Sequence, residues 1–102
     1  MEFEWDDNKN VENIEKHDSI SFEEAVSAFF DEWNIEDFDA LHSDSEEQRF
    51  MIIGLAGFEL LRVTFTIREG ENGAEIIRII SARKAKGYEK SDYEEARNRF
   101  DI

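Results

Sequence analysis

Residues 59–69, ELLRVTFTIRE, alternate apolar and polar side chains without a break from Leu61 to Arg68. One set is Leu61, Val63, Phe65 and Ile67, and the other is Arg62, Thr64, Thr66 and Arg68. Because successive side chains of a strand point to opposite faces of a sheet, this pattern predicts a half-buried antiparallel strand. The rest of the chain has to supply strands that pair with it.

Two further runs predict those neighbours. Residues 50–56, FMIIGLA, are apolar on both faces, and Gly57 with Phe58 predicts a tight turn after them. The turn sequence GENGAE leads into a third strand pattern at 75–85. Simple alternation there puts Ile77, Ile79, Ser81 and Arg83 on one face and Arg78, Ile80, Ala82 and Lys84 on the other. Three strands joined by short glycine-containing turns predict an antiparallel meander.

The residues before the meander predict two helices. Asp6 or Asp7 can cap the first, and Lys16 and His17 stand in its last turn, where positive charge favours the helix dipole. Asp18 follows, and aspartate tolerates the left-handed conformation that ends many helices. The second helix lies in SFEEAVSAFF, whose apolar residues recur at helical spacing: Phe22, Ala25, Val26, Phe29 and Phe30.

The remaining segments complete the predicted fold. Residues 31–48 are polar and acidic with isolated apolar residues, which suggests a short edge strand inside a long connection. After the meander, Ser91 and Glu94 match a capping box, and a final helix is marked by Tyr93, Ala96, Arg97 and Phe100. The predicted class is α+β, with N-terminal helices packed on an antiparallel sheet, a C-terminal helix, and residues 1–102 in a single domain.

Composition limits the kinds of protein that this chain can be. A length of 102 residues with 40% hydrophobic residues suits one compact core. The chain has no long apolar run and starts with MEFEWDD rather than a secretory signal, so we expect a soluble cytoplasmic protein with no membrane contact. With no cysteine and two histidines, neither a metal site nor a cofactor is expected.

The charge of the chain is unevenly distributed. The formal net charge of −14 argues against generic nucleic-acid binding, because a negative surface repels phosphates. Residues 1–48, however, hold 17 acidic residues against two basic ones, Lys9 and Lys16, whereas residues 49–102 hold nine acidic and ten basic residues. Helical spacing lets Lys9, Asn13 and either Lys16 or His17 share a face that can meet the arginine-bearing strands. A phosphate-facing site is therefore expected on the strands, with help from these two lysines.

Four blocks of sequence, in order, resemble one known family. They are FEWDDNKNVENIEKH, SFEEAVSAFFD, EEQRFMIIG, and RIISARKA followed by Glu89 and Tyr93. The chain resembles the BrnT family of ribonuclease toxins of type II toxin-antitoxin systems over nearly its whole length. The resemblance implies a RelE-like fold and an endoribonuclease that cleaves RNA. It also implies neutralisation by a BrnA-like ribbon-helix-helix antitoxin, through which alone the complex contacts DNA.

Metal-independent cleavage of RNA needs a base for the ribose 2′-hydroxyl, cations for the charge on phosphorus, and an acid for the leaving 5′-oxygen. Histidine is suited to acid or base work near neutral pH, lysine can anchor a phosphate or act as a base when desolvated, and arginine grips phosphate through two hydrogen bonds. The candidate catalytic residues are His17, Lys16, Arg83 and Arg49. The candidate RNA-binding residues are Arg68, Arg78, Lys84 and Lys9.

Each candidate also has a structural interpretation. His17 can cap helix carbonyls, Lys16 can be a solvated charge, and Arg49 can pair with Glu46 or Glu47. Arg78 and Arg83 can pair with nearby carboxylates, and Glu89 reads as a solvated or turn residue. Phe3, Trp5 and Tyr93 are expected to pack in the core rather than stack on bases.

Two other functions remain open from the sequence. The first is a toxin-fold protein without catalytic activity that acts as a binding partner or complex subunit, which the net charge favours because it weakens capture of RNA. The second is an unrelated acidic domain that mimics nucleic acid and binds basic proteins.

Overall fold

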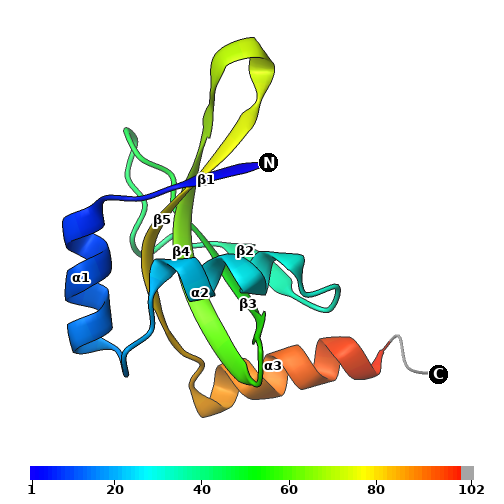
Figure 1. Cartoon of the computed structure of the whole chain (residues 1–102). Helices are drawn as coiled ribbons and strands as arrows, with labels where there is room; N and C mark the ends of the chain where they lie inside the picture. The colour runs from blue at the N-terminus through cyan, green and yellow to red at the C-terminus, as the bar shows by residue number, and fades with distance from the viewer. Residues whose placement is uncertain (100–102) are drawn as a thin grey trace.

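In a computed structural model, which describes residues 1–99, five strands form one sheet in the order β1-β5-β4-β3-β2 (Figure 1). Their bounds are β1 Glu2–Glu4, β2 Ile35–Phe38, β3 Phe50–Ala56, β4 Glu59–Glu69 and β5 Glu75–Lys84. The meander is confirmed as β3-β4-β5, and the edge strand in the long connection is β2. Strand β1, which pairs in parallel with β5, was not predicted, because three residues are too few to show a periodicity.

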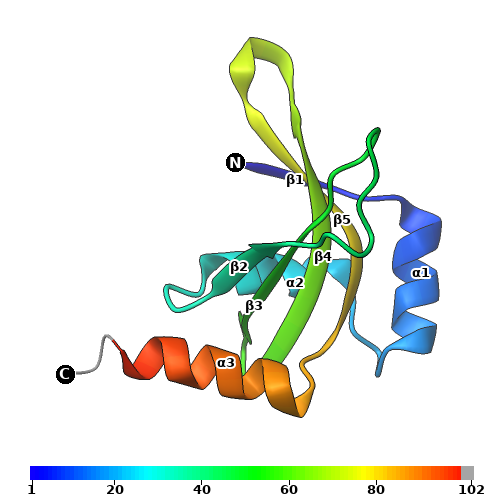
Figure 2. The same cartoon turned by 180° about the vertical axis from the view of Figure 1, so that it is seen from behind.

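Helices cover both faces of this sheet, which confirms the α+β class. The helices are α1 Asp7–Lys16, α2 Phe22–Val26 and α3 Gly87–Asn98, with short 3-10 turns η1 Ser27–Phe30 and η2 Glu71–Gly73. Helix α2 lies in front of the sheet in Figure 1, and Figure 2 shows α3 across the foot of the other face. Phe100 lies outside the described residues. None of the helices within residues 1–99 is long and apolar enough to span a membrane.

The larger core lies between α2 with η1 and the sheet. Its buried members are Ile20, Phe22, Ala25 and Ala28 from the helical side and Ile52, Leu61, Val63, Phe65, Ile77, Ile79 and Ala82 from the strands. Gly54 lets η1 approach β3 closely, because a Cβ there would meet the Ala28 carbonyl oxygen at 2.4 Å. Phe3 and Trp5 pack against this core, with ring centroids 5.1 Å from Phe29 and 6.2 Å from Phe22. Their predicted core role is confirmed.

A smaller core lies under α3. Tyr93 is buried there with Ile53, Leu60 and Ala85, as expected for a residue packing on the sheet. Its hydroxyl donates a hydrogen bond of 2.6 Å to Asp31. Burial, together with that carboxylate, raises the pKa of Tyr93 to about 12, so α3 stays fixed to the sheet by a neutral phenol.

An extra residue in β5 changes which side chains face the core. Phe65 pairs with Ile79 and Thr64 pairs with Ser81, so Ile80 has no partner and forms a bulge. Beyond it the alternation reverses: Ala82 is buried in the larger core, and Arg83 pairs with Arg62 on the opposite face. The predicted placement of Ser81 and Arg83 on the face of Ile77 and Ile79 was therefore wrong, because simple alternation does not allow for a bulge.

Helix α3 starts earlier than predicted. It begins at Gly87, and the Glu89 carboxylate accepts a hydrogen bond of 2.8 Å from the backbone amide of Lys86. Ser91 lies inside the helix, where its hydroxyl donates to the Gly87 carbonyl. The predicted capping box at Ser91 was wrong, because Glu89 already satisfies the helix start one turn earlier.

Beyond the end of β1, helix α1 packs along the outer edge of β5. Strand β1 ends opposite Arg78, and past that point the side chain of Asn13 pairs with the outer edge of β5. Its Nδ2 donates to the Ala82 carbonyl at 2.8 Å, and its Oδ1 accepts from the Ala82 amide at 3.0 Å. Asp18 and Ser19 then turn the chain with φ of 53° and 62°, so the expected left-handed ending is confirmed. These contacts hold the C-terminal end of α1, with His17, against the edge of the sheet.

Candidate active site

Side chains from every border of one sheet face converge on an open cavity of about 330 Å³. We call it the cationic cavity, and its lining residues are His17, His42, Arg49, Arg62, Thr64, Ser81, Arg83 and Lys86. His17 comes from the end of α1, His42 and Arg49 from the β2–β3 connection, and Lys86 from the start of α3. The other four come from β4 and β5, where the bulge at Ile80 turns Ser81 and Arg83 toward this face.

A buried carboxylate fixes the two central arginines. The side chain of Glu89 is 2% exposed and accepts two hydrogen bonds from Arg83, at 2.7 and 2.9 Å. Arg62 Nε lies 3.2 Å from the same carboxylate. Burial alone would raise the pKa of Glu89, but hydrogen bonds from Arg83 and the Lys86 amide hold it below the ordinary value. Glu89 was predicted to be solvated, which is wrong, since it lies beneath both guanidinium groups.

Asp39 is a second buried carboxylate that contacts Arg62. Its side chain is 6% exposed and lies 2.9 Å from His42 Nδ1 and 3.4 Å from Arg62 Nη2. Burial would raise the pKa of this carboxyl, and the hydrogen bonds from His42 with the nearby charges lower it instead. Asp39 is therefore ionised and holds His42 and Arg62 at the rim of the cationic cavity.

Arg49 pairs with a neighbour in the chain, as its structural interpretation predicts. Its Nε lies 2.8 Å from Glu47, and the side chain also lines the cationic cavity. The lining includes Arg49, Arg62, Arg83 and Lys86, whereas the buried acids beneath are Asp39 and Glu89. The cavity thus carries an excess of positive charge in a chain whose formal net charge is −14.

A second groove continues from the cationic cavity along α1. It measures about 220 Å³ and is lined by Lys9, Glu12, Asn13, Lys16, His17, Ile80 and Ser81. His17 and Ser81 belong to both. Lys9, Asn13 and Lys16 therefore face β5 together, as helical spacing predicts, and the two lysines lie beside the cavity rather than within it.

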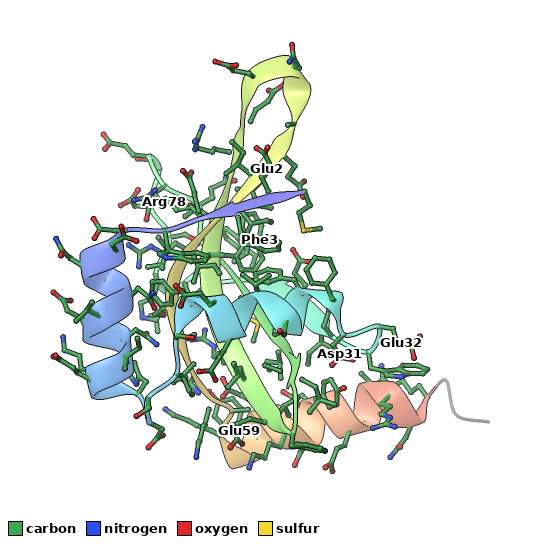
Figure 3. All side chains as sticks on the ribbon, viewed as in Figure 1. Glu2, Phe3, Asp31, Glu32, Glu59 and Arg78 are labelled. Carbon is green, nitrogen blue, oxygen red and sulfur yellow. The ribbon has the colours of Figure 1, made fainter. Side chains whose placement is uncertain are left out.

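Three predicted RNA-binding residues lie away from the cationic cavity. Arg68 and Arg78 are at the β4–β5 hairpin end, where both pair with Glu4 from β1. Lys84 pairs with Glu59 at 3.4 Å near the start of α3. Figure 3 shows Glu59 at the foot of the sheet and Arg78 well above it, near the level of β1. The structure thus brings together His17, Arg49 and Arg83 and places Lys9 and Lys16 next to them.

Sequence reasoning missed several residues at the cavity. The alternation of its strand already placed Arg62 on the polar face of the sheet, which is where the cavity lies. Lys86 and Glu89 flank the start of α3, and Glu89 lies four residues before Tyr93, a spacing that puts both on the buried face of a helix. His42 and Asp39 lie in an irregular acidic connection, where periodicity offers no signal.

A family model described as the ribonuclease toxin BrnT of type II toxin-antitoxin systems matches residues 5–89. The chain belongs to this family. The matched segment of this BrnT-family chain contains every residue that lines the cationic cavity and both carboxylates beneath it. No curated protein sequence matches the chain. Among residues 1–99, no three His, Asp or Glu side chains are grouped as metal ligands.

The geometry of the cavity suits a phosphodiester. Guanidinium groups that are already hydrogen-bonded to buried carboxylates are held in fixed orientations, so binding an anion costs little further side-chain entropy. Arg62, Arg83 and Arg49 can offer remaining N–H donors to phosphate oxygens, and His17 borders the same space. Arginine, lysine and histidine are the residue types that could supply the positive charge and the proton transfer needed for metal-free phosphoryl transfer.

Proposed function

We propose that this BrnT-family protein is a toxin that acts in the cytoplasm as a metal-independent endoribonuclease, with the cationic cavity as its active site. The ribose 2′-oxygen attacks the adjacent phosphorus, and the bond from phosphorus to the 5′-oxygen breaks. The supporting observation is the pair of arginines, Arg62 and Arg83, held over a buried Glu89 in a cavity that His17 also lines. Such preorganised donors stabilise the charge that develops on a phosphorane.

The residues divide the work as follows. Arg83 and Arg62 hold the non-bridging oxygens of the scissile phosphate, and Arg49 adds a third cation at the β3 side. His17 transfers a proton, and Lys16 and Lys9 hold the phosphates of the strand that leaves along the α1 groove. Arg68, Arg78 and Lys84 contact RNA only where a longer substrate passes beyond the cavity.

The partner that we propose is a BrnA-like ribbon-helix-helix antitoxin that covers the cationic cavity. A partner of this kind has to place carboxylates near the exposed cations, because Asp39 and Glu89 already occupy the inner side of the arginines. Co-expression with a candidate ribbon-helix-helix antitoxin, followed by co-purification, tests the assignment. An Arg83→Ala change that abolishes co-purification without unfolding the protein supports a shared surface.

An inactive binding protein is the second candidate. The observation that favours it is that Arg49, Arg62 and Arg83 each already have a carboxylate partner, in a chain with a formal charge of −14. Such a protein binds its antitoxin and leaves RNA intact.

Induced expression in bacteria separates the two candidates. Growth arrest with RNA degradation is expected for the wild type and is lost in Arg83→Ala and His17→Ala variants that remain folded by circular dichroism. Arg99→Ala serves as the matched control, since Arg99 is exposed at the far end of α3 and pairs only with Glu95 among the described residues. A soluble, folded wild type that neither arrests growth nor cleaves RNA supports the inactive protein instead.

A further inference from the structure

We propose that His42 is a second proton-transferring residue of the cationic cavity, the general base for the ribose 2′-hydroxyl, and that Asp39 is its positioning residue. The inference rests on the proposed ribonuclease function and goes further, because it assigns the two proton transfers to two histidines. His42 lies in the acidic connection between β2 and β3, which otherwise reads as a solvated loop.

The connection around His42 is ordered by a set of hydrogen bonds. The Asp39 carboxylate accepts from the His42 ring at 2.9 and 3.1 Å and from the His42 amide at 3.3 Å. Ser43 Oγ donates to the Asp39 carbonyl and accepts from the Arg49 amide, each at 2.7 Å, and the Asp39 amide donates to the Arg49 carbonyl. The His42 side chain is 53% exposed, and the segment that carries it is tied to the start of β3 through Ser43 and the Asp39 backbone.

The hydrogen bond to Asp39 selects the tautomer of His42. A neutral imidazole carries one N–H, and the carboxylate accepts it from Nδ1. Nε2 then carries the lone pair and is the ring nitrogen left for a substrate in the cavity. When Nε2 takes the proton of a 2′-hydroxyl, the ionised Asp39 stabilises the imidazolium that forms, the role of the carboxylate in an Asp-His pair.

His17 is placed to make the complementary transfer. It follows the last residue of α1, where the helix dipole stabilises positive charge, and it enters the same cavity from a different border. The 2′-oxygen bonds to phosphorus as His42 takes its proton, and the 5′-oxygen leaves as His17 donates one. The products are a 2′,3′-cyclic phosphate and a 5′-hydroxyl, so the step needs no co-reactant.

The charges around His42 come from several elements. Asp39 bonds to its ring, Arg62 of β4 shares that carboxylate, and the cavity adds His17, Arg49, Arg83 and Lys86. Asp39 is thus the charged group in contact with the His42 ring, and the cations border the space that a phosphate would occupy.

The test uses the purified full chain and a randomised pool of single-stranded RNA, with the matching DNA pool as a substrate that lacks the nucleophile. His42→Ala is expected to lower kcat about 100-fold, and added imidazole is expected to restore part of it. Asp39→Asn is expected to lower kcat about tenfold and to shift the acidic limb of the pH–rate profile, which the general base controls. Glu36→Gln, on the exposed side of β2, is the matched control.

The outcomes separate this inference from the proposed function. If the wild type cleaves neither the randomised RNA pool nor cellular RNA, the ribonuclease function itself is overturned. Wild type that cleaves RNA while folded His42→Ala keeps full activity overturns the role of His42 alone. Activity that is lost in His42→Ala and not rescued by imidazole points to a structural histidine and also overturns the base assignment. Thermal unfolding of each variant shows whether the fold is retained.

Discussion

Strands β4 and β5 carry a pair of arginines at each end, Arg62 with Arg83 at the cationic cavity and Arg68 with Arg78 near the hairpin. Each pair contacts one glutamate. At the cavity the Glu89 side chain is 2% exposed, whereas at the hairpin Glu4 is 29% exposed and Arg68 is 54% exposed. The arginines and the strands are the same, and the main difference is the depth of the shared glutamate, to which Asp39 adds a second buried carboxylate at Arg62.

That depth decides what each pair can do. A buried carboxylate accepts hydrogen bonds from some N–H groups of each arginine and so fixes the orientation of the guanidinium group. The remaining N–H groups are then available to a ligand in the cavity. A carboxylate in water forms an ion pair that solvent and salt weaken. The cavity therefore has preorganised donors, and the hairpin has a solvated charge cluster.

The largest effect expected from this difference is on ribonuclease activity. Arg83→Ala should lower kcat/KM about 100- to 1,000-fold, because it removes a preorganised donor to the phosphate, while Arg68→Ala should change it less than about threefold. Cleavage of labelled RNA under single-turnover conditions measures both. Arg83→Lys keeps the charge and loses the two-pronged hydrogen bond, so it should recover only part of the activity. Equal losses at Arg83 and Arg68 would contradict the importance of the buried carboxylate.

The second effect concerns stability. Glu89→Gln should lower the free energy of unfolding by about 2 kcal/mol, since it keeps the shape of the side chain but leaves Arg83 without its counter-charge and Arg62 with Asp39 alone. Their partial exposure keeps the loss below that of a fully buried pair. Urea unfolding followed by circular dichroism measures the change, and Asp92→Asn, an exposed carboxyl on α3, is the control. A stability of Glu89→Gln equal to that of the control would show that the ion pairs contribute nothing net.

The third effect is the response to acid. Glu89 has a pKa below its ordinary value of 4.5 in the folded protein, so the unfolded chain takes up this proton first as pH falls. Its contribution is fully present above pH 4.5 and is lost as pH falls through the folded pKa. The wild type should therefore lose more stability than Glu89→Gln below about pH 4.5, measured as urea midpoints across a pH series. Parallel curves for the two proteins would rule out Glu89 as the source.

Particular residues show how far the sequence predicts this arrangement. Alternation at 59–69 and the paired helices are enough for the α+β class and for the polar face that holds Arg62. The placement of Arg83 depends on the bulge at Ile80, which no glycine or break in the apolar pattern marks. Glu89 shares a helix face with Tyr93, but the sequence does not show that Arg62 and Arg83 lie over that face.

Periodicity in the sequence predicts nothing about the irregular connection between β2 and β3. Asp39, His42 and Ser43 are held by side-chain bonds to one another and to the backbone at Arg49. These contacts have no periodicity and depend on where β3 begins. The same is true of Asn13, whose spacing on α1 predicts a shared face with the lysines, whereas its bonds to Ala82 depend on β1 ending early.

The smallest effect is expected at the hairpin and tests the comparison from its other side. The Arg68 hydrogen bond lowers the pKa of Glu4, which has the same sign as the shift of Glu89, yet both partners are partly exposed to solvent and screening weakens the ion pair. Glu4→Gln should therefore leave the melting temperature unchanged within error, and any small loss at low ionic strength should disappear in high salt. Differential scanning fluorimetry at two salt concentrations is sufficient. If Glu4→Gln instead destabilised the protein as much as Glu89→Gln, and did so in high salt, the depth of the carboxylate would not be what separates the two ends, and the parallel strand β1 that carries Glu4 would have to be treated as part of the cooperative core.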